Sequence, residues 1–442
     1  MEKIKRKGAL SEFARYVSLN VAGMIGLSCY ILADTFFVAA GLGTNGLTAL
    51  NLAIPVYSFI HGSGLMIGMG GGTKYSILRS RGNGSGANRA FINSLYIAAA
   101  LAAVFVLLGV FCSGGISSLL GADEEVFAMA NTYLKVILLF APAFLLNNVL
   151  LCFVRNDGGP QLSMAAMITG SLSNVVLDWV FIFPCGMGIF GAAFATGLAP
   201  IISMAVLLRH FIQKKNSFRI VRCIPSLRLC GGMISSGIPS LITEVSSGVV
   251  IIVFNAIIIR LQGNVGVAAY GVIANLSLVV IAVYTGMAQG IQPIMSRDHG
   301  AGERSRIYQI LRYAVISAVV FSAAVYAVIF IGASGIVGIF NSEGNELMQS
   351  IGTDGMRLYF IGCPFAGFNI IASVYFTSTE KQLPAHIISV LRGFAVIIPM
   401  AFLLSAAAGL NGVWCAFPAT EITVSSFAAV FLMKTVDQNL RA

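Results

Sequence analysis

The sequence predicts an all-α integral membrane protein of about 12 transmembrane helices in two six-helix lobes. Three observations predict this fold class. The 442-residue chain is 57% hydrophobic and only 10% charged, with a mean hydropathy of +0.88, whereas soluble domains carry about 25% charged residues. Apolar windows long enough to cross a bilayer recur along the chain. Patterns in the first half also return in the second, about 220 residues later.

Windows of about 20 predominantly apolar residues define the spans. The basic N-terminus, 1–7, precedes a stretch that is too long for a signal peptide and contains Asp34, so we interpret it as an uncleaved first helix. The longest hydrophilic piece is about Gln213–Leu229, at the middle of the chain. The predicted spans are 13–39, 46–76, 90–112, 126–152, 161–183, 188–212, 232–260, 265–295, 308–332, 354–378, 384–408 and 410–434.

Basic residues gather in alternate connections. The N-terminal tail, the loop after span two, the piece between spans six and seven and the loop after span eight are rich in Lys and Arg, and the intervening loops almost lack them. This positive-inside pattern predicts a multi-pass protein of the cytoplasmic membrane, in contact with lipid, with both termini in the cytoplasm. It also accounts for the net charge of +10, so we expect no nucleic-acid partner. We expect the protein to act as a monomer.

Signals for cofactors and for enzymes are missing. The eight cysteines are scattered without a CxxC pair, and the chain has only four histidines, so we expect neither a disulfide framework nor a metal-ligand cluster. The sequence has no Walker A, HExxH or GxSxG motif, which argues against an ATP-driven pump or a membrane hydrolase. We therefore predict no enzymatic activity and no cofactor apart from a coupling ion.

The two halves share glycine patterns. Six spans per repeat give both halves the same orientation, so we predict a parallel pseudo-twofold relation between lobes 1–220 and 221–442. Repeats of this kind build secondary transporters, with the site between or within the halves near the membrane midplane. The matched patterns are Gly68-Met69-x-x-Gly72 with Gly286-Met287-x-x-Gly290, Gly115-Ile116 with Gly335-Ile336, and Gly188-x-x-Gly191 with Gly409-x-x-Gly412.

Small residues form a face in span two. Gly64-x-x-x-Gly68-x-x-x-Gly72 places three glycines on one side of a helix. Such faces let two membrane helices approach closely. We interpret this motif as a packing surface and assign it no binding role.

Two aspartates lie inside apolar spans, Asp34 in span one and Asp178 in span five. A carboxylate at the centre of a membrane helix costs about 2.5–3.5 kcal/mol on insertion scales, so such residues usually serve function. Asn174 lies one turn before Asp178, so we expect its amide oxygen and the carboxylate to face one point, and Thr196 in span six could add a hydroxyl. An all-oxygen cluster suits a hard cation such as Na⁺, and two adjacent carboxylates could instead hold a proton. The alternative for Asn174 and Thr196 is simple hydrogen bonding between helices.

Other polar residues inside spans are candidates for lining a substrate cavity. Glu244, after Pro239 in span seven, could take protons or cationic substrate. Its alternative is a carboxylate near the cytoplasmic end that reaches headgroup water. Asn255, Asn275 and Asn369 either line the cavity or join helices by hydrogen bonds.

The second half has its own charged residues inside spans. Arg392, in span eleven, is a further cavity candidate and could pair with an acid of the second lobe. We interpret Glu421 as mostly structural. By the repeat offset, the position of Asp178 corresponds to Met400, which is apolar. The carboxylate pair therefore marks the first lobe as the seat of coupling.

This ordered set of motifs resembles the multidrug and toxic compound extrusion (MATE) family, in particular its bacterial MepA-like branch. The resemblance covers essentially the whole chain and implies two lobes that form a V around a central cavity. It implies export of small amphipathic or cationic organic compounds, driven by Na⁺ or H⁺ influx. It also implies a first-lobe cation site at Asp34, Asn174, Asp178 and Thr196. The motifs are Ala33-Asp34-Thr35, Asn174-x-x-x-Asp178, Gly237-Ile-Pro-Ser-Leu-Ile-Thr-Glu244, Gly290-Ile-Gln-Pro293 and Ser378-Thr-Glu-Lys381.

Three other functions stay open from the sequence. A lipid-linked glycan flippase of the same superfamily is the nearest, but such proteins often have about 14 spans. An intramembrane enzyme would use Asp34 and Asp178 as an acid and base pair, without the companion motifs that hydrolases carry. A receptor or static scaffold would show no cation-dependent flux.

Overall fold

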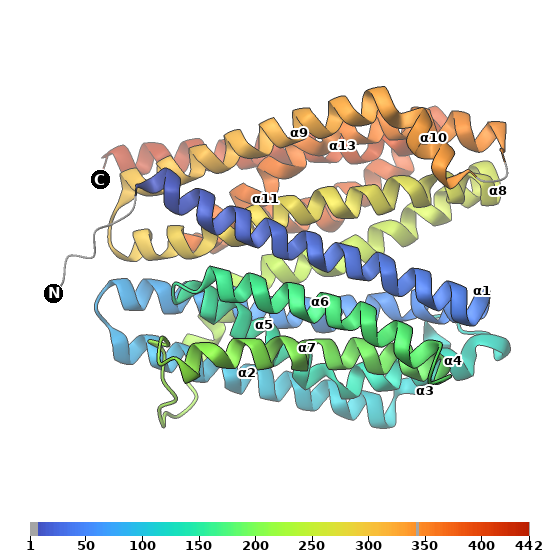
Figure 1. The fold of residues 1–442 in the computed structure, drawn as a ribbon. Helices are drawn as coiled ribbons and strands as arrows, with labels where there is room; N and C mark the ends of the chain where they lie inside the picture. The colour runs from blue at the N-terminus through green and yellow to red at the C-terminus, as the bar shows by residue number, and fades with distance from the viewer. Residues whose placement is uncertain (1–7, 342–343, 442) are drawn as a thin grey trace. The chain divides into compact units, whose positions relative to one another are not determined.

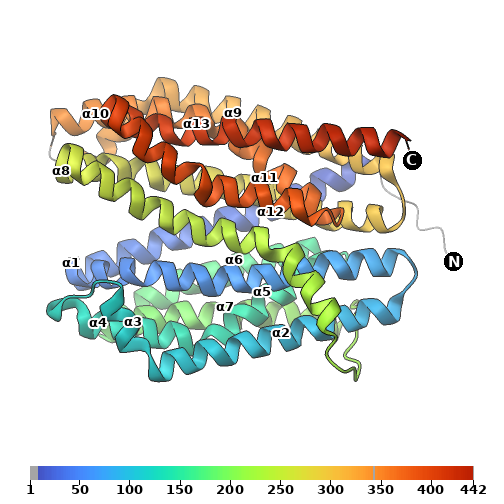
Figure 2. The same ribbon diagram turned by 180° about the vertical axis from the view of Figure 1, so that it is seen from behind.

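The chain folds almost entirely into helices, and the part that the structure describes contains no strand (Figure 1, Figure 2). The computed structural model describes residues 8–341 and 344–441. Its helices are α1 (Ala9–Ser80), α2 (Gly84–Phe111), α3 (Ser113–Leu119), α4 (Glu124–Leu139), α5 (Ala141–Asn156), α6 (Pro160–Ile182), α7 (Gly188–Ile212), α8 (Leu227–Gly300), α9 (Arg304–Phe340), α10 (Glu346–Tyr359), η1 (Phe360–Gly362), α11 (Cys363–Ser378), α12 (Gln382–Val390), η2 (Leu391–Ala395) and α13 (Ile397–Arg441).

Three helical stretches are longer than one membrane crossing needs, and each is broken at a glycine. α1 turns at Gly43 (φ 67°), α8 at Gly263 (φ 62°) and α13 at Gly409 (φ 57°). Glycine adopts such positive φ values at no steric cost. Among the described residues, 8 helices, or up to 9 with the bent α4–α5 pair, are long and apolar enough to cross a membrane. The all-α membrane fold is confirmed, and the broken stretches make the helix count consistent with the 12 predicted spans.

Backbone turns repeat between the two halves of the chain. Positive φ values recur at positions about 220 residues apart, which the glycine motifs predicted at the level of sequence. A duplicated backbone needs the same turns at equivalent places, so these pairs support duplication of a six-helix unit. The pairs are Gly43 and Gly263, Gly82 and Gly302, Gly121 and Gly344, Gly158 and Glu380, and Gly188 and Gly409.

The chain divides into two compact units. The first unit comprises Ser18–Val245 and Gln292–Arg304, and the second comprises Met1–Val17, Ser246–Ile291 and Ser305–Ala442. The start of α8 belongs to the first unit, because a Cβ on Gly237 would lie 1.9 Å from a backbone oxygen of α1. The predicted repeat lobes, 1–220 and 221–442, remain a prediction.

The glycine face of span two packs against α5, as predicted. Along Gly64-x-x-x-Gly68-x-x-x-Gly72, the three glycines lie opposite Asn148, Cys152 and Asn156 in turn. A Cβ on Gly68 would lie 2.8 Å from the Asn148 carbonyl oxygen and 2.8 Å from Cys152 Sγ. These distances leave no room for a side chain, so the glycines set the separation between α1 and α5.

The connection between α7 and α8, residues 213–226, runs as an extended strap over the first unit, and we call it the linker. Phe218 anchors it, with 0% of its side chain exposed among the rings of Tyr75, Phe91 and Phe153. The turn after α1 and the linker lie at one end of the first unit, and α3 lies at the other (Figure 1). The basic connections of this unit therefore share one end.

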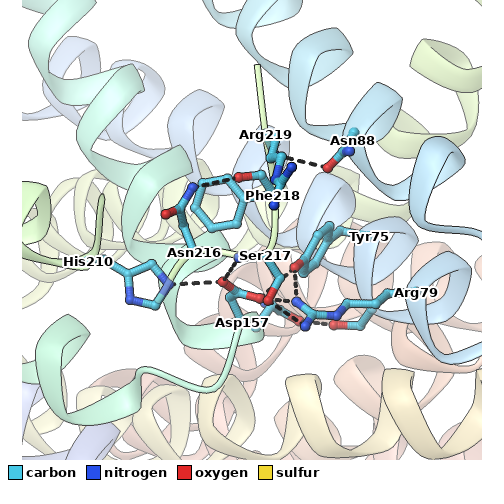
Figure 3. A network of polar contacts seen from close by, with 11 residues as sticks. Tyr75, Arg79, Asn88, Asp157, His210, Asn216, Ser217, Phe218 and Arg219 are labelled. Atoms are coloured by element: carbon cyan, nitrogen blue, oxygen red, sulfur yellow. Dashed lines mark hydrogen bonds and ion pairs between the residues drawn. The ribbon is translucent and has the colours of Figure 1, made fainter. Parts of the chain in front are cut away.

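A buried carboxylate holds the linker to the helix ends (Figure 3). Asp157 accepts hydrogen bonds from Tyr75 Oη (2.6 Å), His210 Nε2 (2.9 Å) and the Ser217 backbone N–H (2.7 Å), and pairs with Arg79. Burial alone would raise the pKa of the Asp157 carboxyl. The hydrogen bonds from His210, Tyr75 and Ser217, together with the Arg79 charge, hold that pKa below its usual value.

Candidate functional site

The structure brings the predicted first-lobe residues together inside the first unit. Asp34 comes from α1, Asn174 and Asp178 come from α6, and Thr196 comes from α7. All four are buried, with Asn174 and Asp178 at 0% exposure. The carboxyl groups of Asp34 and Asp178 lie close enough to interact electrostatically. Residues 144 positions apart in the chain thus form one polar cluster.

Close approach of α1 to α6 makes this cluster possible. A Cβ on Gly23 would lie 3.0 Å from Met167 Sδ, and a Cβ on Gly41 would lie 2.4 Å from Ile182 Cγ2. These glycines lie on either side of Asp34 in sequence. Their missing side chains allow the two helices to meet closely enough for the carboxyl groups to interact.

The Asn174 amide serves Asp178 as a hydrogen-bond donor. With its nitrogen toward Asp178, it donates to Oδ2 at 2.9 Å, and its oxygen accepts from the Thr196 backbone N–H at 3.3 Å. The Thr196 hydroxyl donates to the Ala192 carbonyl at 3.0 Å. The one-turn spacing predicted that the Asn174 amide oxygen and the Asp178 carboxylate face one point. In this arrangement the amide oxygen faces elsewhere. It faces α7, because the amide satisfies both neighbours only in that orientation.

One oxygen of each aspartate is buried without a donor. These atoms are Asp34 Oδ1 and Asp178 Oδ1, and neither aspartate forms an ion pair with a basic side chain within the described ranges. Two adjacent carboxylates in a low-dielectric site cannot both stay ionised without a positive charge. A proton on either carboxyl group removes this repulsion. The arrangement can therefore hold one proton or one small cation.

Tyrosine hydroxyls surround this cluster, and the sequence reasoning missed them. Tyr133 of α4 lies within electrostatic range of Asp34 and Asp178. Tyr30 lies one helical turn before Asp34, and its hydroxyl is 2.7 Å from that of Tyr57. The spacing of Tyr30 to Asp34 was a usable signal, because residues four apart share a helix face. Nothing in the sequence pattern pointed to Tyr133.

Glu244 belongs to the first unit, although its span was predicted to open the second lobe. It lies beside α1, where a Cβ on Gly62 would be 3.0 Å from Glu244 Cβ. The neighbouring His61 acts electrostatically on the Glu244 carboxylate. Both side chains are partly exposed. The structure therefore places a second acidic position in the same unit as the aspartate pair.

Arg392 pairs with an acid of the second unit, as predicted. Arg392 lies within the π-helical turn η2, and its Nε donates to Glu421 Oε1 at 2.6 Å. Asn369 Nδ2 donates to Glu421 Oε2 at 2.7 Å, and the Ser425 hydroxyl donates to Asn369 Oδ1 at 3.1 Å. Glu421 is 2% exposed and Asn369 is 0% exposed, so this cluster joins α11, η2 and α13. The structure does not bring Asn369 to an accessible surface.

The remaining cavity candidates lie apart from this cluster. Asn255 is half-buried and Asn275 is exposed, and both lie on α8 in the second unit. Neither joins the aspartate pair, which belongs to the first unit. Their assignment to a cavity remains a prediction.

Comparisons with known proteins agree with this architecture. The family model described as MatE matches residues 21–180 and 239–403, once in each half. "Multidrug export protein MepA" of Staphylococcus saprophyticus is 26% identical over 442 residues, which cover 97% of this chain and 96% of that protein. The protein of the same name from Staphylococcus aureus strain N315 is 26% identical over 416 residues, with 92% and 91% coverage.

Solved structures share the fold. A crystal structure of "MATE in complex with MaL6" superposes with a TM-score of 0.93 at 22% identity, covering 99% of this chain and 98% of that chain. An outward-facing "multidrug resistance MATE family transporter of the MOP superfamily" gives 0.91 at 22% identity, with the same coverage. A MOP superfamily transporter from Pyrococcus furiosus gives 0.90 at 22% identity, covering 98% and 97%.

Proposed function

This chain belongs to the MatE family, and from that premise we propose that it exports small amphipathic or cationic organic compounds across the cytoplasmic membrane. The relatives that carry the name multidrug export protein match more than nine-tenths of the chain, which supports the same activity here. We further propose that both termini face the cytoplasm, since the N-terminal tail is basic and basic connections alternate along the chain with loops that almost lack Lys and Arg. The transporting species is a monomer in contact with lipid.

The coupling site is the pair Asp34 and Asp178. The observation that carries this assignment is the pair of buried oxygens without donors, one on each carboxyl group. A bound positive charge would stabilise these oxygens, and the low dielectric of the buried site strengthens that attraction. Asn174 and Thr196 hold Asp178 in place through the amide contacts described above.

The close approach of two buried carboxyl groups favours a proton as the coupling ion. One proton shared by such a pair removes the repulsion between two buried negative charges. A sodium ion would need the Asn174 amide to turn its oxygen toward the carboxylates, which would end its donation to Asp178. Na⁺ therefore remains the second candidate for the same oxygens.

Coupling follows if ion binding changes the relative stability of two transporter states. A ligand shifts an equilibrium only through its different affinity for the two states. A proton on the aspartate pair removes charge repulsion, and loss of that proton restores it. Substrate with a positive charge would favour the ionised carboxylates, among which Glu244 is the partly exposed one. The two positive charges then prefer different states, which is antiport.

The test is efflux of a cationic dye from proteoliposomes with a pH gradient or a sodium gradient imposed separately. Asp34→Asn and Asp178→Asn should each reduce gradient-driven transport by at least about 10-fold while the protein remains in the membrane. Glu124→Gln is the matched control, because this exposed acid lies outside the site. Full transport by both aspartate variants would refute the assignment. Transport driven only by the sodium gradient would identify Na⁺ as the coupling ion in place of the proton.

A further inference from the structure

A second titratable pair, His61 and Glu244, lies in the first unit and is not part of the aspartate site. A line of aromatic hydroxyls leads toward it. The Tyr30 and Tyr57 hydroxyls are 2.7 Å apart, and the Tyr57 ring stacks on His61 with centroids 5.9 Å apart and planes inclined by 14°. Tyr57 and His61 are one helical turn apart, so they share a face of α1.

Tyr57 lies in the electric field of carboxylates on both sides. Asp34 and Glu244 each act electrostatically on its hydroxyl, and Asp34 also acts on Tyr30. Tyr57 is therefore the group that both acidic positions reach. Tyr57, His61 and Glu244 are partly exposed, so water can complete the remaining contacts between them.

The order of these groups follows the length of α1. At a rise of about 1.5 Å per residue, Asp34 lies about 14 Å along the helix from the Gly43 turn, and Tyr30 and Tyr57 both lie about 20 Å from it. His61 lies about 27 Å from the same turn on this scale. The groups thus progress from the aspartates toward the end of α1 that carries Arg79 and the basic turn.

Asn148 is a hydrogen-bond partner of the His61 ring. Its amide nitrogen lies 3.2 Å from His61 Nδ1, and an amide N–H₂ group can only donate, so Nδ1 accepts. The ring hydrogen then resides on Nε2. Rotation of the amide would present its oxygen to Nδ1, where the oxygen would accept a hydrogen bond from an N–H group. Asn148 therefore offers His61 Nδ1 a hydrogen-bond partner whether this nitrogen accepts or donates.

We propose that Tyr57 and His61 carry protons between the Asp34–Asp178 pair and Glu244 within the first unit. This inference rests on the proposed function, since it assumes that the aspartate pair binds a proton. In each step a hydroxyl or ring nitrogen accepts one proton and releases another, so no covalent bond other than O–H and N–H bonds is made or broken. The path starts with one proton on the aspartate pair and ends with one proton on Glu244.

The titratable groups along this path come from four helices, and α5 contributes the Asn148 amide and the Phe144 ring, which packs edge-on against Tyr57. Asp34 and Asp178 form no ion pair with a basic side chain among the residues described. The groups are Asp34, Tyr30, Tyr57 and His61 of α1, Tyr133 of α4, Asp178 of α6 and Glu244 of α8.

Tyr57→Phe and His61→Gln test the path in proteoliposomes. Tyr57→Phe keeps the ring and removes the hydroxyl, and His61→Gln keeps a hydrogen-bonding partner for Asn148 but cannot be protonated. Both should reduce pH-gradient-driven transport of a cationic dye by at least about 10-fold and flatten its dependence on pH, because general proton transfer by a positioned group contributes about 10²–10⁴-fold. Dye-for-dye exchange without a gradient should stay within about twofold, because exchange needs no net proton transfer. Tyr96→Phe and His386→Gln are the matched controls.

The outcomes separate the path from the coupling site. An inactive Asp34→Asn together with wild-type pH-driven rates in both path variants would overturn the path and leave the coupling site intact. Full pH-driven transport by Asp34→Asn and Asp178→Asn would overturn both. Equal loss of driven transport and exchange would assign Tyr57 and His61 a structural role and would also overturn the path. If His61→Gln does not reach the membrane, Tyr57→Phe decides alone.

Discussion

Removal of the Glu421 carboxylate should destabilise the second unit strongly. This carboxylate is 2% exposed and accepts from Arg392 Nε at 2.6 Å and from Asn369 Nδ2 at 2.7 Å. Glu421→Ala would leave the Arg392 charge buried without its counter-ion, which costs about 3–5 kcal/mol. In a unit of about 200 residues, where 1 kcal/mol corresponds to about 2–4 °C, the Tm should fall by about 6–20 °C.

A graded series identifies the origin of this loss. Glu421→Gln keeps an acceptor oxygen and nearly the same volume but removes the charge, so its Tm should lie between those of the wild type and Glu421→Ala. The double variant Arg392→Met with Glu421→Met removes both charges and fills the space, and buried ion pairs replaced in this way are often neutral or more stable. Thermal unfolding of the purified protein in detergent, followed by intrinsic fluorescence, measures all three. A double variant as unstable as Glu421→Ala would refute the unpaired-charge explanation and point to lost packing instead.

Three further predictions concern the first unit. The pKa of Asp157 is lower in the folded protein than in the unfolded chain. The ionised Asp157 therefore stabilises the folded state fully above about pH 4, and this stabilisation is lost as pH falls through the folded pKa. Hydrogen exchange of the linker amides should rise over that pH range in the wild type, and Asp157→Asn should abolish this pH dependence. Phe218→Ala should cost about 3–5 kcal/mol and expose the linker to trypsin at neutral pH. Gly68→Ala should lower stability by about 1–3 kcal/mol through overpacking against α5, measured by the same unfolding assay, whereas Gly115→Ala, with open space around it, should have little effect.

The parts of the fold that follow from local chemistry were predictable from the sequence. Apolar windows, the glycine face of span two and the 3.6-residue period that places Asn174 beside Asp178 each depend on neighbours in the chain. The membership of Glu244 in the first unit was not predictable, because it depends on how the start of α8 packs against α1. Tyr133 was missed for the same reason, since an isolated tyrosine in an apolar span looks like any other core residue.

The orientation of the Asn174 amide was equally out of reach. Helical spacing fixes the face on which an amide lies, but the choice between its oxygen and its nitrogen depends on every neighbour that the side chain meets. Here those neighbours are Asp178 and the Thr196 backbone N–H, from two helices. The pairing of Arg392 was easier to predict, because a buried arginine must find an acid and few acids lie inside the second half.

The two halves share their backbone turns but neutralise buried charge in different ways, and this difference supports coupling in the first unit. In the second unit the Glu421 carboxylate has a fixed cation, Arg392, and an amide donor. A mobile cation gains little there, because it would compete with a guanidinium that cannot leave. In the first unit Asp34 and Asp178 have no such fixed cation among the described residues, and each retains a buried oxygen without a donor. Only a charge that can enter and leave completes that site, and a site completed by an exchangeable charge is what an ion-driven transporter needs.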